Sequence, residues 1–227
     1  MNSLLGVGIY SVQEAAAITG IEARKIRRWL FQYRNNEFNG LWKTELSGLD
    51  MSDNLSFHDL LELRFVNAFR NHGVSFQAIR VAALHAQELI GSKYPFTCKK
   101  FLTDGQSIFA QTLEETGDEC LMDLVKKQYV FKQVISDSLY AGIEYNDNNL
   151  ASRWYPTRSR KIVLDPTRSF GKPILTDFGI TTETLFAAWK AEDKNYRIVA
   201  DTYEIPLDQV KAAIGFEQRI ASNEVLH

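Results

Sequence analysis

Basic side chains are concentrated in one short stretch near the start of the chain, "GIEARKIRRW", from Gly20 to Trp29. Lysine and arginine bind phosphate oxygens, and arginine can also make paired hydrogen bonds to the edge of a guanine. The chemistry that such a cluster suggests is nucleic-acid binding. A run of like charge is also common on a solvent-exposed helix face that binds nothing, so the elements that position these side chains must decide between the two interpretations.

Two short helices are predicted around this stretch. Ser11 and Glu14 have the spacing of a capping box, and Gly20 can end the first helix. The second helix, predicted from about 22 to 30, carries apolar residues along one side at helical spacing, namely Ala23, Ile26, Trp29 and Leu30. At about 100° per residue, the basic residues then fall on the opposite side, with Arg24, Lys25 and Arg28 facing away from the apolar side and Arg27 at its edge.

A short helix, a glycine turn and a second helix with a basic face predict a helix-turn-helix whose second helix enters the major groove of DNA. Residues 31–54 are rich in asparagine and glycine, which predicts an irregular or two-stranded wing. The candidate DNA-binding residues are Arg24, Lys25, Arg27, Arg28, Arg34 and Lys43. Because one short helix with about four basic residues gives little affinity, we expect a homodimer that binds a symmetric operator.

Composition limits the classes of protein that fit. The chain has 227 residues, of which 45% are hydrophobic, and can therefore bury substantial cores. Its 26 basic and 28 acidic side chains give a formal net charge of -2, so any DNA affinity must be local. Cys98 and Cys120 have no metal-ligand or disulfide spacing. With no basic leader and no run of about 18 apolar residues, we expect a cytoplasmic protein that is neither exported nor membrane-spanning.

No pattern in the sequence is typical of an enzyme. The histidines are scattered and have no cysteine or carboxylate at metal-ligand spacing; they are His58, His72, His85 and His227. Glycine-rich phosphate loops and a nucleophile elbow are absent from the sequence. Three carboxylates that could act as acid or base have simpler structural roles. Glu62 is predicted on a helix surface, Asp104 in a hairpin turn and Asp165 in a turn before proline. We expect no catalytic residue, metal site or cofactor.

The whole pattern predicts a mainly α fold with small β elements. Two capped amphipathic helices, "SFHDLLELRFVNAFRNHG" and "SFQAIRVAALHAQELIG", complete an N-terminal DNA-binding domain over residues 1–95. Residues 96–160 are predicted to form a connecting region, with a β-hairpin around Asp104-Gly105, a loop from 112 to 123 and a helix from 125 to 145.

Residues 161–227 are predicted to form a small C-terminal domain. Two short strands, "KIVL" and "KPIL", precede three helices that begin near Thr181. The last of these helices has no basic face, so we expect this trihelical unit to bind protein rather than DNA. Trp29 and Trp189 occupy apolar helical positions and are predicted to lie in the cores.

The N-terminal motifs "YSVQEAAAITGIEARKIRRW" and "LSFHDLLELRFVNAFRNHGVSFQAIRVA" resemble the winged helix-turn-helix of MerR-type regulators, over roughly Ile9 to Ile90. In that family an arginine followed by aromatic residues closes the recognition helix, and Arg27-Arg28-Trp29 stands at the matching place. The chain departs from the family in the wing, where "LSFHDL" replaces the usual Arg-x-Tyr before the third helix. The resemblance implies operator binding.

The C-terminal run "IVLDPTRSFGKPILTDFGITTETLFAAWKAEDKNYRIVADTYEIPLDQVKAAIGFEQ" resembles the C-terminal domain of a group of VapB-type antitoxins. Asp165-Pro166, Gly171-Lys172-Pro173 and the turn from Tyr203 to Val210 stand in matching order. Many members carry an arginine just before the isoleucine corresponding to Ile180, whereas this chain has Gly179. The order of domains resembles a long-form VapB-type antitoxin.

This resemblance implies an antitoxin of a type II toxin-antitoxin system that binds and neutralises a PIN-like ribonuclease toxin and represses their shared operon. A PIN-type active site gathers carboxylates around a metal, so basic residues of the antitoxin could pair with them. The candidates are Arg158, Arg160, Lys161, Arg168 and Lys172, which could equally be ordinary loop residues. Two alternatives remain open, a MerR-type effector-responsive transcriptional regulator and a protein-interaction adaptor that does not contact DNA.

Overall fold

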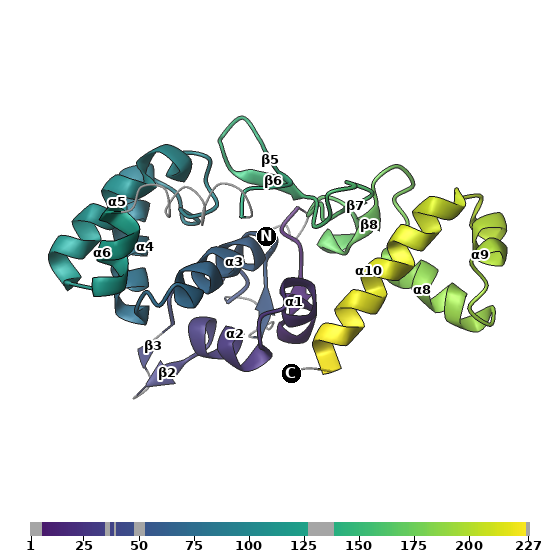
Figure 1. The fold of residues 1–227 in the computed structure, drawn as a ribbon, viewed down its shortest axis with the longest axis horizontal. Coiled ribbons are helices and arrows are strands. Elements are labelled where there is room, and N and C mark those ends of the chain that lie inside the picture. Colours follow the sequence, from purple (N-terminus) through teal and green to yellow (C-terminus); the bar gives the residue numbers. More distant parts are fainter. Residues whose placement is uncertain (1–5, 35–36, 39, 48–52, 127–138, 226–227) are drawn as a thin grey trace.

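The computed structural model describes residues 6–34, 37–38, 40–47, 53–126 and 139–225. Within these residues the protein is mainly helical with small two-stranded antiparallel sheets, as predicted (Figure 1). The helices are α1 (Val12–Thr19), α2 (Ala23–Leu30), α3 (Phe57–Asn71), α4 (Phe76–Ile90), α5 (Phe101–Thr116), α6 (Glu119–Lys126), α8 (Thr182–Ala191), α9 (Tyr196–Tyr203) and α10 (Leu207–Val225), with a short 3-10 helix, η1 (Ser169–Gly171). The paired strands are β1 (Tyr10–Ser11) with β4 (Asn54–Leu55), β2 (Tyr33–Arg34) with β3 (Glu37–Phe38), β5 (Ile143–Tyr145) with β6 (Ala151–Trp154), and β7 (Ile162–Val163) with β8 (Ile174–Leu175).

Serine side chains begin the first, third and fourth helices, as the sequence predicts. The hydroxyls of Ser11, Ser56 and Ser75 each accept a hydrogen bond of 3.1 Å from the backbone N–H three residues later. In α1 and α3 the carboxylates of Glu14 and Asp59 accept the N–H of the capping serine in return, which completes two capping boxes. These bonds satisfy backbone donors that the first helical turn leaves without an intrahelical partner.

The hairpin predicted around Asp104-Gly105 is wrong, because both residues lie in helix α5. The buried residues of α5 recur at helical spacing and pack on α4; they are Phe101, Gly105, Ile108, Phe109 and Thr112. Burying this face outweighs the turn preference of an Asp-Gly pair and the cost of about 1 kcal/mol for a glycine within a helix. Asp104 lies in the first turn of the helix, where a carboxylate is favourable.

The loop predicted for residues 112–123 is also wrong, because α5 runs to Thr116 and α6 begins at Glu119. Gly117, at a φ of 64°, ends α5. Residues 127–138 of the helix predicted from 125 to 145 lie outside the described residues, and the last part of that prediction is a strand, β5, rather than a helix.

The strand β5 forms because a side chain closes the turn that follows it. The side-chain oxygen of Asn146 accepts the backbone N–H groups of Asn148 and Leu150 at 3.0 and 3.1 Å. This bonding reverses the chain and pairs β5 with β6.

The predicted strands and helices of the C-terminal part are confirmed. The "KIVL" and "KPIL" segments supply β7 and β8, and Thr181 caps α8 by accepting the N–H of Thr184 at 3.2 Å. Trp189 is buried, as predicted, against the aromatic rings of Phe186 and Tyr196.

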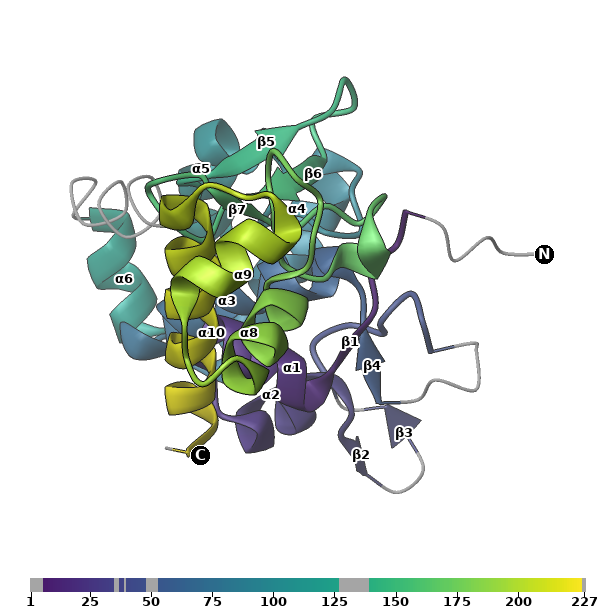
Figure 2. The ribbon, with the colours of Figure 1, turned by 90° about the vertical axis from the view of Figure 1, so that its right-hand side faces the viewer.

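Two large hydrophobic clusters and a small one, formed by Tyr155, Val163 and Ile174, lie among the described residues. The largest includes residues of α1 to α5 and reaches Trp154 of β6, and the second joins α8, α9 and α10 to β7 and β8. Helix α10 packs beside α1 (Figures 1 and 2), where the Asn223 side chain donates a 3.0 Å hydrogen bond to the carbonyl of Ala17. The Tyr10 hydroxyl donates to the carbonyl of Gly171 at 2.6 Å, so residues far apart in the sequence are directly bonded.

Candidate nucleic-acid interface

The first two helices are joined by a turn that the sequence specifies locally. Gly20 ends α1 at a φ of 70°, a left-handed conformation that glycine adopts without a steric penalty. Ile21 is buried directly after it, and α2 then buries Ile26, Trp29 and Leu30. The carbonyl of Trp29 accepts the N–H of Leu41 at 2.7 Å. The inner side of α2 is therefore held at several points along its length.

The outer side of α2 presents all four basic residues of the cluster to solvent, namely Arg24, Lys25, Arg27 and Arg28. Their exposure agrees with the distribution predicted around the helix, whereas their role as DNA ligands stays a prediction. Arg27 and Arg28 lie in the last turn, where positive charge also complements the helix dipole.

An acidic residue at the start of α2 was missed in the sequence reasoning. The carboxylate of Glu22 lies 2.5 Å from the Lys25 ammonium and 3.5 Å from the Arg24 guanidinium. The Arg24 side chain is 90% exposed, and exposed pairs of this kind contribute about 1 kcal/mol or less. A phosphate can therefore replace Glu22 as the partner of either cation at small cost.

Lys43 is exposed on a segment that a buried carboxylate fixes to α3. Asp59 accepts hydrogen bonds from the Trp42 indole at 2.7 Å and from the Thr44 hydroxyl. It also accepts the Ser56 N–H at 2.9 Å within the capping box. Both neighbours of Lys43 are thus anchored, and nothing in the spacing of these residues predicted that arrangement.

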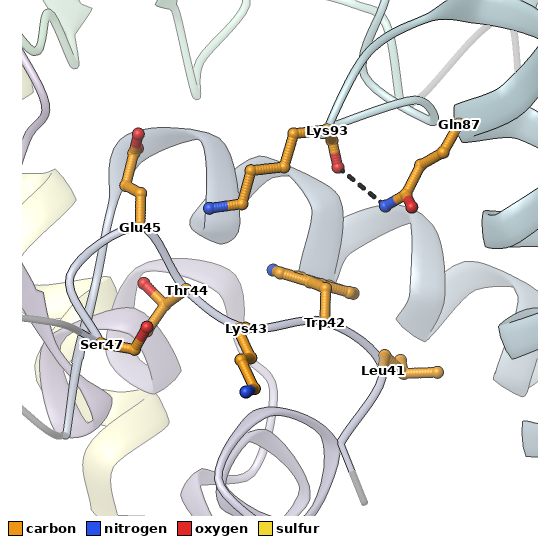
Figure 3. Close-up of a pocket in the computed structure, with 8 residues that line it drawn as sticks. All are labelled: Leu41, Trp42, Lys43, Thr44, Glu45, Ser47, Gln87 and Lys93. Atoms are coloured by element: carbon orange, nitrogen blue, oxygen red, sulfur yellow. Dashed lines mark hydrogen bonds between the residues drawn. The ribbon is translucent and has the colours of Figure 1, made fainter. Parts of the chain in front are cut away.

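The same segment lines a cavity of about 490 Å³. Figure 3 shows Trp42 and Lys43 on opposite sides of the segment, with the Lys93 ammonium turned toward the side that Trp42 occupies. Glu45 lies at the edge of this cavity. Burial opposes ionisation of Glu45, but hydrogen bonds from His58 and Ser56 outweigh it and lower the pKa of its carboxyl. The cavity therefore has ionised groups of both signs on its wall.

Arg34 lies in the β2–β3 hairpin, where its backbone is paired with that of Glu37. A two-stranded element is thus present within the stretch predicted as a wing. The structure places Arg34 on a different element from the basic face of α2, and Lys43 on a third.

The five basic candidates of the C-terminal part lie in two loops on either side of β7, and three of them are in ion pairs, Arg160 with Glu144, Lys161 with Asp208 and Lys172 with Glu183. The Lys161 ammonium lies 2.6 Å from the carboxylate of Asp208, and Lys172 lies 2.8 Å from Glu183. The hydrogen bond from Lys161 lowers the pKa of Asp208, and the bond to Glu183 raises the pKa of Lys172. Arg158, Arg160 and Arg168 are exposed.

Glu62 and Asp165 are not surface carboxylates. Glu62, predicted on a helix surface, is 2% exposed and accepts hydrogen bonds of 2.9 Å from both the N–H and the hydroxyl of Thr97. Asp165 precedes Pro166 as predicted, but is 1% exposed and pairs with Arg153 at 2.9 Å. The charge of Asp165 raises the pKa of Arg153.

Across the described ranges, no group of three or more histidine, cysteine, aspartate or glutamate residues could hold a metal ion. Cys98 is buried and Cys120 is exposed, and both are free thiols. In the same part of the chain, no helix has the length and apolar character needed to cross a membrane.

The chain was compared with family models, with curated proteins and with solved structures. No family model matches the chain. A protein of Mycobacterium tuberculosis named "Putative antitoxin VapB45" is 29% identical over 170 residues, which is 70% of this chain and 70% of that protein. The crystal structure of Rv2018 from Mycobacterium tuberculosis is 25% identical and has a TM-score of 0.70, covering 92% of this chain and 98% of that chain.

Proposed function

We propose that this protein is the antitoxin of a type II toxin-antitoxin system, which binds a PIN-like ribonuclease toxin and represses its own operon through the basic face of α2. The observation that carries the proposal is the similarity to a protein named as an antitoxin over 70% of the chain. The exposed basic face of α2, on a helix whose other side is buried, supports the DNA-binding part.

The DNA-binding part depends on phosphate and base contacts from Arg24, Lys25, Arg27 and Arg28. Helix α2 spans only eight residues, about two turns, so one copy reaches few base pairs. Two copies on a symmetric operator double the number of base pairs reached, which supports a homodimer as the binding form. Arg34 and Lys43 flank α2 in the sequence and are proposed as phosphate ligands outside the groove.

The salt dependence of operator binding tests this assignment. Replacing Arg24 and Arg28 together by alanine removes two phosphate ligands per protomer, and the slope of log K against log salt should fall by roughly 0.9 for each phosphate ligand removed. Arg197→Ala, at an exposed position on α9, is the matched control and should keep the wild-type slope. An unchanged slope in the double variant would exclude the basic face of α2 as the DNA-binding surface.

The toxin-binding part is assigned first to Arg168. A Cβ atom placed on Gly179 would lie 2.5 Å from Nη2 of Arg168, so this guanidinium occupies the space beside a residue where resembling antitoxins carry an arginine. Arg158 is the next candidate because it is exposed. Arg160, Lys161 and Lys172 are weaker candidates because they are already in ion pairs.

Growth of cells that express the adjacent reading frame, with and without this protein, tests the antitoxin role. We expect growth arrest that this protein relieves, and a stable complex of the two proteins on co-purification. Arg168→Ala should weaken the complex by about tenfold, the worth of one charge-assisted hydrogen bond, and Arg197→Ala should not. Growth without arrest, and no complex, would refute the antitoxin role.

An effector-responsive regulator is the second candidate function, and the cavity beside Trp42 favours it. This cavity is about 490 Å³ in volume, within the usual range of ligand pockets. A regulator of this kind would show a rise in melting temperature with a small molecule, together with a change in operator affinity. An antitoxin would show its large stabilisation with a protein partner instead.

A further inference from the structure

A second cavity, of about 320 Å³, lies between α3 and the segments that flank the β5–β6 hairpin. Its lining comes from the middle of α3, from the two residues before β5, and from the end of β6 with the turn that follows. Three of the lining residues are arginines, namely Arg64, Arg158 and Arg160, and none is an aspartate or glutamate, so the wall of the cavity is positively charged.

Arg64 supplies the inner charge of this cavity. Its guanidinium carbon lies 4.1 Å from the centroid of the Trp154 ring, which is a cation–π contact. Burial lowers the pKa of Arg64 to about 10, so the side chain stays charged at neutral pH. A charge that is largely removed from water attracts an anion more strongly than an exposed charge does.

Arg160 supplies a second charge at the mouth of the cavity, from a strained backbone position. Its φ is 54°, a left-handed conformation that a residue with a side chain adopts at a cost of about 1 kcal/mol or more. The Thr176 hydroxyl donates to the carbonyl of Arg160 at 2.7 Å and holds this conformation. The guanidinium carbon of Arg160 lies 4.0 Å from the centroid of the Tyr155 ring.

The carboxylate that pairs with Arg160 belongs to Glu144, which is not a lining residue of the cavity. Arg158, in the same turn as Arg160, is exposed. The planar guanidinium of arginine has paired N–H donors whose spacing matches the oxygens of phosphate and carboxylate groups. Because these donors are held in one plane, an arginine loses less entropy on binding than the flexible ammonium group of a lysine.

We propose that this cavity binds a small dianionic oxyanion, namely phosphate or the phosphate group of a small phosphorylated molecule, through Arg64, Arg158 and Arg160. The volume is at the low end of ligand pockets and has room for a phosphate with a small organic part. Three positive charges favour a dianion over a singly charged carboxylate. Because the lining joins α3 to the turn before β7, occupancy stabilises the junction between these elements.

Calorimetric titration of the full chain with inorganic phosphate, at constant ionic strength and without DNA or toxin, tests the proposal. We expect saturable binding of one phosphate per chain, weakened about tenfold by Arg158→Ala, the worth of one charge-assisted hydrogen bond. Arg197→Ala removes the same charge from α9 and should keep the wild-type affinity. No saturable binding, or equal weakening in both variants, would overturn the proposal.

Two further measurements separate a specific site from general attraction to positive charge. Arg64→Lys keeps the positive charge but removes the paired N–H donors of the guanidinium. A folded Arg64→Lys protein should bind phosphate about tenfold more weakly. If this variant does not fold, the Arg158→Ala comparison decides alone. Acetate should bind at least about tenfold more weakly than phosphate, and equal affinities would exclude a dianion site. These assays need no partner, so their outcome is independent of the proposed antitoxin role.

Discussion

The buried carboxyl of Glu62 makes a quantitative prediction about stability and pH. Glu62 is on α3, 2% exposed, with both donors of Thr97 at 2.9 Å from one of its oxygens. Burial raises its pKa from 4.5 to about 8, with a further contribution from the nearby charge of Asp59, and the bonds from Thr97 only partly oppose this. The folded protein therefore holds Glu62 protonated at neutral pH, while the unfolded chain ionises it.

The number of protons bound by the folded and unfolded chains decides whether the free energy of unfolding rises or falls with pH. Between 4.5 and about 8 the unfolded chain binds fewer protons at Glu62 than the folded chain, so the free energy of unfolding falls as pH rises. The stabilisation that protonated Glu62 gives the folded protein is complete below the pKa of Glu62 in the unfolded chain. It is lost as the pH rises through the pKa of Glu62 in the folded chain. At roughly 1.4 kcal/mol per pH unit, ionisation of the unfolded chain costs about 3 kcal/mol of stability by pH 7 and about 5 above pH 8.

Glu62→Gln tests this magnitude, because the amide keeps an oxygen for the two bonds from Thr97 and cannot ionise. Urea unfolding should give nearly equal stabilities near pH 4.5, with the variant more stable by roughly 3 kcal/mol at pH 7. Glu88→Gln, at an exposed position on α4, should follow the wild type throughout. A difference between Glu62→Gln and wild type that does not change with pH would refute a protonated, buried Glu62.

Two further substitutions test the packing of distant elements. Gly142→Ala should destabilise the fold by roughly 3 kcal/mol or more, because the new methyl group would collide with the carbonyl oxygen of Tyr155 at a position whose φ is 78°; an unchanged melting temperature would contradict the close approach of Gly142 to Tyr155. Asn223→Ala should cost about 1 kcal/mol by removing the hydrogen bond to Ala17, whereas Ser222→Ala, one residue earlier and exposed, should cost less in the same thermal melt.

The helix starts and the basic face of α2 could be predicted because they depend on residues close together in the sequence. A capping box joins Ser11 to Glu14, three residues away, and the positions of Arg24 and Arg28 around the helix follow from its period alone. The same reasoning placed β7, β8 and the C-terminal helices, where short β-branched runs and Thr181 act as local signals.

The middle of the chain could not be predicted in this way, because tertiary packing there stabilises structures that differ from those which the local sequence favours. Asp104-Gly105 is a strong turn pair in isolation, yet the apolar face of α5 gains more by burial on α4 than the turn would gain. Glu62 has the character of a surface residue, but the donors that satisfy it come from Thr97, 35 residues later. Sequence reasoning has no signal for such a distant partner.

The sequence by itself therefore determined the local units of this protein, which are its capped helices, its glycine turns and the distribution of charge around α2, since these follow from backbone geometry over a few residues. Only the tertiary structure decided which polar groups are buried together and which cavities exist. Asp59 is hydrogen-bonded to Trp42, Tyr10 is hydrogen-bonded to Gly171, and Arg64 makes a cation–π contact with Trp154. The physical reason is that these contacts join residues far apart in the chain, and their free energy depends on burial that no local pattern specifies.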